Sequence, residues 1–137
     1  FSTCFAAPFI IWQPEKYGNL LEKKLIKHNT NVWLINTGWI GGEYGKGKRI
    51  PLKHTRSIID SIHNNELNNI DCINLPFFNI DIPTKVRDVP LDVLIPMNGW
   101  DSEDNYLKKL ENLYNNFKKD FVDNYGLKLY NRLNNKL

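Results

Sequence analysis

Three stretches of the chain carry apolar residues at helical spacing. The first follows Pro14, a residue suited to an opening helical turn, and runs to about His28 with the stripe Tyr17, Leu20, Leu21 and Leu25. The second lies within residues 55–63, where Ile58, Ile59 and Ile62 share one face. The third covers about residues 102–125, with the stripe Leu107, Leu110, Leu113, Tyr114, Phe117 and Phe121. Each stripe predicts an amphipathic helix.

The ends of the longest helix carry their own signals. Asp101 or Ser102 can cap its start, and acidic residues at 103 and 104 suit the positive end of the helix dipole. Gly126 is a suitable stop, and the Lys- and Asn-rich tail after it is expected to fray. Capping therefore explains the acidic cluster at residues 101–104 without a catalytic role.

Two further stretches have the pattern of strands. Residues 31–36 form a short apolar run bounded by polar residues, which predicts a buried strand. Residues 77–82 alternate apolar and polar side chains up to Pro83, which predicts a half-buried strand. Four glycines between positions 41 and 47 predict a loop after the first strand, and the three prolines within residues 83–100 predict irregular chain. The expected fold class is α/β, a mixed α+β segment.

Length and composition narrow the class of protein. A chain of 137 residues, 42% hydrophobic and 24% charged, fits one globular unit spanning residues 1–137. It contains no apolar run near the roughly 20 residues of a membrane helix, so no membrane partner is expected. The net charge of +3 is scattered and Lys-rich, with no Arg cluster among stacking aromatics, so no nucleic-acid partner is expected either.

The two cysteines and the single methionine bear on setting and completeness. Cys4 and Cys72 have neither metal-site spacing nor nearby histidines, and Cys4 suits a small core residue, so a reducing, cytoplasmic setting is expected. The only methionine is Met97, and the chain opens directly on apolar sequence. Both features suggest a segment of a longer protein.

The glycine-rich stretch is the strongest chemical signal. Residues 42–48 read Gly-Glu-Tyr-Gly-Lys-Gly-Lys, which satisfies the phosphate-loop pattern except that Arg49 replaces its final Ser or Thr. An arginine cannot coordinate the magnesium that this hydroxyl holds. A glycine turn needed only for chain reversal is the plain alternative, but Lys46, Lys48 and Arg49 crowd three cations into it, which favours an anion or a polar ring.

The wider stretch resembles ATP-dependent phosphoenolpyruvate carboxykinases. The resemblance is carried by Asn36-Thr-Gly-Trp39 and by the residues that follow it at family spacing: Gly41-Gly42, Tyr44-Gly45, Gly47-Lys48-Arg49, Lys53, Thr55 and Arg56. The opening residues 1–9, the helix start at 14–17, Asn65-Glu66-Leu67 and residues 78–83 follow in the family's order. It covers essentially the whole chain and weakens after Trp100, where only helical character agrees.

The resemblance implies both an activity and a site. The family converts oxaloacetate and ATP to phosphoenolpyruvate, carbon dioxide and ADP in gluconeogenesis, with Mg²⁺ and Mn²⁺ as metals. It implies that the chain is an incomplete C-terminal nucleotide-binding lobe, in which Arg49, Ile50 and Thr55 form the adenine side of the ATP pocket. The guanidinium stacks on the purine, Ile50 offers an apolar wall and backbone groups, and Thr55 a hydroxyl.

The catalytic and metal-binding residues of that family lie upstream of the matched region. The resemblance therefore implies that this segment contains none of them, that the upstream part of the same chain is its partner, and that the segment is inactive alone. His28, His54 and His63 lack the spacing of a helical zinc pair, which agrees with the expectation of no metal site. Among the four tryptophans, Trp39 is the one expected near a ligand.

Two alternatives remain from other classes. The basic glycine loop suits a non-catalytic interaction module that binds a protein or nucleic acid, whose signature would be steep salt dependence without an effect of ATP. It also suits a minimal phosphate-loop nucleotidase, which would hydrolyse nucleotide with magnesium by itself.

Overall fold

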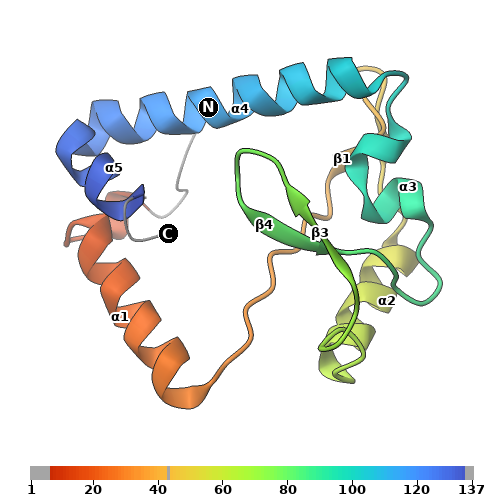
Figure 1. The fold of residues 1–137 in the computed structure, drawn as a ribbon, viewed down its shortest axis with the longest axis horizontal. Helices are drawn as coiled ribbons and strands as arrows, with labels where there is room; N and C mark the ends of the chain where they lie inside the picture. Colours follow the sequence, from red (N-terminus) through yellow and green to blue (C-terminus); the bar gives the residue numbers. More distant parts are fainter. Residues whose placement is uncertain (1–6, 43, 135–137) are drawn as a thin grey trace. The chain divides into compact units, whose positions relative to one another are not determined.

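The computed structural model describes residues 7–42 and 44–134, which form helices and two small sheets (Figure 1). The chain divides into two compact units, Phe1–Asn36 and Thr37–Leu137. The mixture of α and β structure agrees with the fold class that the sequence predicts. Among the predicted features, the structure of residues 1–6, including Cys4, lies outside the described residues.

The first unit is built around one helix. A short 3₁₀ turn, η1 (Ala7–Phe9), comes first. Helix α1 (Pro14–His28) follows and has the predicted bounds. Asn29 adopts a left-handed conformation with φ 47°, and its backbone N–H donates to the Ile26 carbonyl. This left-handed cap ends the helix. No residue of α1 is buried, although its apolar stripe includes Leu20 and Leu21.

The strand predicted at residues 31–36 is wrong. These residues have no regular secondary structure, and Val32, Leu34 and Ile35 are exposed. In the described part of the chain, strands pair only as β1 with β2 and β3 with β4, so no strand forms a ladder with this run. A strand needs a neighbour for its backbone N–H and C=O groups, which apolar side chains cannot replace.

The second unit opens with a β-hairpin. Strands β1 (Trp39–Ile40) and β2 (Lys48–Arg49) pair antiparallel, with Trp39 opposite Arg49 and Ile40 opposite Lys48. The sequence predicts a loop that leads directly to a helix. This prediction is wrong in one respect, because Lys48 and Arg49 form a strand between the loop and the helix. Helix α2 (Leu52–His63) follows, beginning three residues before the predicted Thr55 because Pro51 serves as its N-cap.

A second hairpin joins β3 (Cys72–Leu75) and β4 (Ile80–Pro83), with Ile73 opposite Ile82. The strand predicted at residues 77–82 is confirmed only from Ile80, and β3 has no counterpart in the prediction. Phe77 and Asn79 have positive φ, 67° and 51°, so the residues before Ile80 form the turn. Apolar and polar residues alternate through this turn as well as through β4. The sequence pattern therefore places the start of the strand too early.

The proline-rich connection contains two short helical turns where irregular chain was predicted. These are α3 (Leu91–Leu94) and the 3₁₀ helix η2 (Pro96–Gly99). Pro90 directly precedes α3, and Pro96 opens η2. Proline fits at a helix start because its missing N–H would have no partner there. The prolines therefore start these turns instead of preventing them.

Helix α4 (Glu103–Tyr125) has the predicted extent, and Ser102 caps it by accepting from the Asn105 N–H at 3.4 Å. Gly126, with φ 86°, ends it as predicted. The tail expected to fray instead forms α5 (Leu127–Asn134), which folds back beside the end of α4 (Figure 1). The Tyr114 and Tyr130 hydroxyls lie 2.9 Å apart, and Phe121 contacts the Tyr130 ring. These contacts order the tail.

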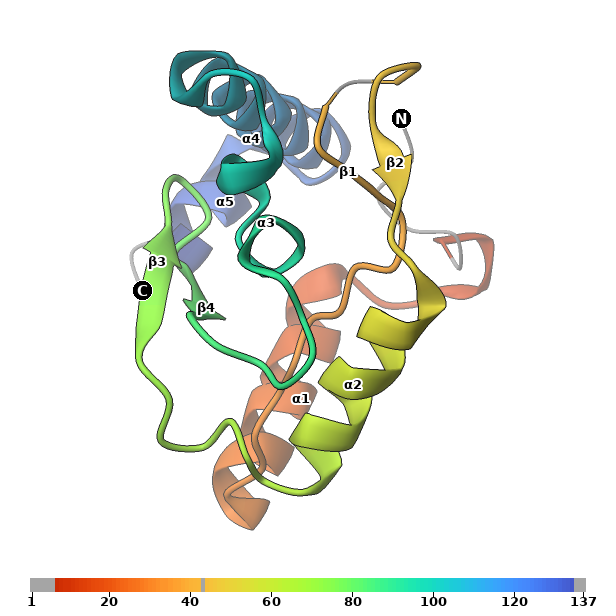
Figure 2. The ribbon, with the colours of Figure 1, turned by 90° about the vertical axis from the view of Figure 1, so that its right-hand side faces the viewer.

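The core of the second unit is small. Leu67, Val86, Tyr106 and Leu110 are its buried apolar side chains among the described residues. Phe78 joins the second hairpin to α4 through edge-to-face contacts with Tyr114 and Phe117. In Figure 2 the first hairpin rises beside the start of α4 and α2 leads away from β2. The first hairpin, β1 and β2, positions the candidate site.

Candidate functional site

The first hairpin places an arginine and a tryptophan on one face. Trp39 and Arg49 are directly opposed across β1 and β2, and opposed residues of an antiparallel pair project to the same side. Both side chains are exposed, Trp39 by 67%. A guanidinium and an indole are the two side chains best suited to stack on a planar ring. This face is therefore chemically suited to a purine.

Ile50 directly follows Arg49 and is fixed by the same hairpin. Its backbone N–H donates to the Gly38 carbonyl at 3.0 Å, and its side chain is half-buried. That N–H is thus engaged within the protein. The apolar side chain is the part of Ile50 that remains able to form a wall.

Thr55 lies apart from this exposed face. It belongs to α2 and is 7% exposed, as is its neighbour His54. His54 Nδ1 lies 2.9 Å from the Asp88 carbonyl oxygen, which fixes this turn of α2 against the chain after β4. The structure thus brings Arg49 and Ile50 together and keeps Thr55 beneath the surface.

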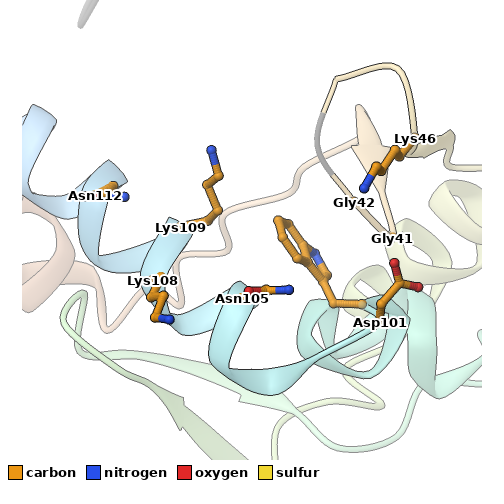
Figure 3. A pocket seen from close by; sticks show the side chains of 9 residues that line it. Gly41, Gly42, Lys46, Asp101, Asn105, Lys108, Lys109 and Asn112 are labelled. Carbon is orange, nitrogen blue, oxygen red and sulfur yellow. The ribbon is translucent and has the colours of Figure 1, made fainter.

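A pocket lies between the glycine loop and helix α4, with a volume of about 360 Å³ (Figure 3). The loop contributes Gly41, Gly42 and Lys46, and the chain before α4 contributes Trp100 and Asp101. Four polar residues of α4 complete the lining: Asn105, Lys108, Lys109 and Asn112. None of Arg49, Ile50 and Thr55 lines this pocket.

The α4 residues of this pocket are the functional candidates that sequence reasoning missed. Positions 105, 108, 109 and 112 have the spacing of one helix face, so the sequence did contain a polar stripe. The stripe was overlooked because it resembles an ordinary solvated face. Only the fold shows that the glycine loop lies opposite it.

Two glycines hold the loop close to the start of α4. A Cβ on Gly41 would lie 3.2 Å from the Gly99 carbonyl oxygen, and a Cβ on Gly99 would lie 3.3 Å from the Gly41 Cα. Gly41 also has φ 80°, which disfavours other residues. This close backbone contact sets the width of the pocket.

The glycine stretch does not have phosphate-loop geometry. In a phosphate loop the Lys opens the helix that follows, whereas Lys48 lies in β2 and α2 begins only at Leu52. Gly41, Gly42 and Gly45 all have positive φ and serve the chain reversal between β1 and β2. The pattern match at residues 42–48 therefore belongs to a hairpin.

Residues 7–42 and 44–134 contain no cluster of three or more His, Cys, Asp or Glu side chains able to hold a metal ion. No helix in this part of the chain is both long and apolar enough to cross a membrane. Burial raises the pKa of the Tyr106 hydroxyl, whose ring packs edge-on against Trp100. Tyr106 therefore stays neutral around the physiological range and supports the pocket by packing.

Comparison with known proteins identifies the family. A family model described as phosphoenolpyruvate carboxykinase matches residues 1–92, which include the hairpin and α2. The chain belongs to the phosphoenolpyruvate carboxykinase family. The match confirms the resemblance, and it ends just inside α3, before the α4 side of the pocket.

Curated relatives extend the carboxykinase similarity further along the chain. Proteins named phosphoenolpyruvate carboxykinase (ATP) are 42% identical in Dictyostelium discoideum and 45% identical in Alkaliphilus oremlandii, each over 91% of this chain. The protein of that name in Fusobacterium nucleatum is 46% identical over 88% of this chain. The matched region is only 22–24% of the length of these relatives. The chain thus spans less than a quarter of a carboxykinase.

Proposed function

We propose that this chain is the adenine-binding segment of an ATP-dependent phosphoenolpyruvate carboxykinase. The complete enzyme would convert oxaloacetate and ATP to phosphoenolpyruvate, carbon dioxide and ADP. The observation that carries the proposal is the cross-strand pair of Trp39 and Arg49 on an exposed hairpin face, within the region that matches the family. In this proposal the chain forms part of the nucleotide-binding lobe.

In the proposed site, each side chain has a distinct role toward ATP. The Arg49 guanidinium stacks on the adenine face and donates to its edge, and the half-buried Ile50 side chain forms the apolar wall. Thr55 supplies its hydroxyl from the first turns of α2, where its burial restricts its rotamer. ATP itself supplies the phosphoryl group that the reaction transfers.

The remaining chemistry belongs to the upstream part of the enzyme in this proposal. The residues that hold Mg²⁺ and Mn²⁺, bind oxaloacetate and contact the phosphates would come from there. The chain by itself is accordingly proposed to be inactive. A cytoplasmic, reducing setting is part of the proposal and fits the free, exposed thiol of Cys72.

The decisive experiment measures steady-state kinetics of the complete enzyme carrying Arg49→Ala. We expect the KM for ATP to rise roughly tenfold, the size of one lost stacking and hydrogen-bonding cation, with a smaller fall in kcat. Thr55→Val keeps the side-chain volume and tests the hydroxyl alone, with the same direction expected.

Lys48→Ala is the matched control for the arginine variant. Lys48 is the adjacent cation of β2 and opposes Ile40, so it projects to the other side of the hairpin. Its removal should leave the KM for ATP within about twofold, the range of a surface substitution. An unchanged KM for ATP in both Arg49→Ala and Thr55→Val would refute the proposed site.

A further inference from the structure

The pocket between the glycine loop and α4 is cationic and is formed by segments far apart in the sequence. Lys46 comes from the loop between β1 and β2, whereas Lys108 and Lys109 come from one face of α4. In Figure 3 the side chains of Lys46 and Lys109 extend from opposite sides toward the space between loop and helix. Among the described residues of the lining, three are lysines and one, Asp101, is acidic.

We propose that this pocket is a binding site for a small polyanion, a phosphate- or carboxylate-bearing molecule distinct from the nucleotide at Arg49. Lysine ammonium groups bind such ligands as point charges, and the amides of Asn105 and Asn112 add hydrogen-bond donors in the same lining. The site therefore takes its ligand by charge and amide donation.

The volume and the lining limit what the ligand is. At about 360 Å³ the cavity is near the lower end of small-molecule sites, which suits a compact anion. Trp100 provides one apolar wall, and apart from the two glycines the other described residues of the lining have polar or charged side chains. The Asp101 carboxylate repels any anionic group at its own end of the pocket. The negative charge of the ligand therefore lies on the side of the lysines.

The surrounding structure keeps the two sides of the pocket in place. The close approach of Gly41 and Gly99 fixes the loop against η2, and η2 leads directly into the Ser102 cap of α4. A Cβ on Gly42 would lie 3.2 Å from the Lys46 Cβ, so the loop is tight where Lys46 leaves it. The cationic groups are thus presented by a constrained backbone.

The test titrates the complete enzyme by calorimetry, without divalent metal, first with pyrophosphate and then with citrate. The test variant is Lys108→Gln combined with Lys109→Gln, and we expect the pocket's dissociation constant to rise about tenfold, with steeper weakening at high ionic strength in the parent. Pyrophosphate binding alone would identify a phosphate ligand, and citrate binding alone a carboxylate ligand.

Lys23→Gln combined with Lys24→Gln is the matched control. These two lysines are also adjacent, exposed and helical, but they lie on α1 and outside the pocket lining. The control removes the same charge and should leave binding unchanged. Because all four lysines are exposed, thermal unfolding of both variants should match the parent.

Three results would overturn the proposal. Equal weakening in the control would mean that net charge attracts the anion without a site. If the parent enzyme bound neither anion more tightly than the Lys108/Lys109 variant does, the pocket would have no polyanion ligand. Loss of the same binding event in Arg49→Ala would place the anion on the nucleotide side, and that outcome leaves the proposed ATP role of Arg49 intact.

Discussion

At the scale of single residues, the positive-φ glycines of the loop differ in what surrounds them. Gly41 and Gly45 have φ 80° and 88°, but only Gly41 faces a neighbouring backbone, the Gly99 carbonyl. Nothing lies within 4 Å of a Cβ on Gly45. Substitutions at these two glycines therefore separate the cost of backbone strain from the cost of a steric contact.

We expect Gly41→Ala to lower the free energy of unfolding by roughly 2–3 kcal/mol, because backbone strain and a tight contact with the Gly99 carbonyl oxygen add. Gly45→Ala should cost only about 1 kcal/mol, since it adds strain alone. Urea unfolding of both variants measures the difference. Equal losses would show that the Gly99 carbonyl accommodates a Cβ on residue 41 at no cost in stability.

A second residue-scale prediction concerns the tyrosine pair that joins α4 to α5. The hydrogen bond to Tyr130 raises the pKa of Tyr114 above its ordinary 10.0, and burial and repulsion from Tyr130 raise it further, against a lowering by Asn134. The folded state therefore holds this proton more tightly than the unfolded chain. Its contribution to stability is full below pH 10 or so and is lost as pH rises through the raised pKa.

Tyrosine titration by NMR with labelled side chains measures this effect. Tyr130→Phe removes the partner hydroxyl, so the midpoint of Tyr114 should fall toward its ordinary value. Stability above pH 10 or so should then fall less steeply than in the parent. A Tyr114 midpoint that does not move would show that the hydroxyl pair does not persist in solution.

At the scale of elements, the start of α4 depends on one cap. The sequence allows Asp101 or Ser102, and in the structure Ser102 accepts the Asn105 N–H. Ser102→Ala should lower the free energy of unfolding by about 1 kcal/mol, the usual cost of losing a capping oxygen. Asp101→Ala should change it by less than about 0.5 kcal/mol, as for an exposed residue outside a cap. Thermal unfolding would contradict the assignment if Asp101→Ala had the larger effect.

Elements with a complete local signal were predicted well. Pro14 and the apolar stripe after it fix α1, and Ser102, the long stripe and Gly126 fix α4. Strands were predicted poorly, because a strand exists only through its partner. The run at 31–36 has the composition of a strand, but no described strand pairs with it. By contrast, β3 pairs with β4, although the residues of β3 have no clear strand pattern.

At the scale of the whole molecule, the chain exposes many large apolar side chains for its small core. They include Phe9, Ile11, Leu34, Trp39 and Leu52. The chain also spans less than a quarter of its carboxykinase relatives. Together these observations favour a segment that functions within a longer protein.

We expect the 137-residue chain alone to form no phosphoenolpyruvate from oxaloacetate and ATP, and the complete enzyme to form it. A coupled assay of both proteins at equal concentration measures the difference. The assay should include Mg²⁺ and Mn²⁺, so that the metals are not limiting. Product from the chain alone would contradict the assignment of the catalytic groups to the upstream part.

The candidate site divides in the same way as the fold. Arg49, Ile50 and Thr55 were named from residues that resemble a family signature, yet their sequence proximity does not reveal that Thr55 lies buried in α2 while Arg49 is exposed. Lys108 and Lys109 were not named, because lysines on a helix are usually solvated. Their role in a pocket depends on what lies opposite them.

The sequence by itself determined the family, the bounds of α1 and α4 and the position of the glycine loop, because local spacing, caps and turn residues carry that information. Tertiary structure alone decided that the glycine loop belongs to a hairpin and that Trp39 is opposite Arg49 in it. It also decided that Lys46 lines the same pocket as the polar face of α4. Strand pairing and the closeness of distant segments depend on how the whole chain packs. No short stretch of sequence encodes them.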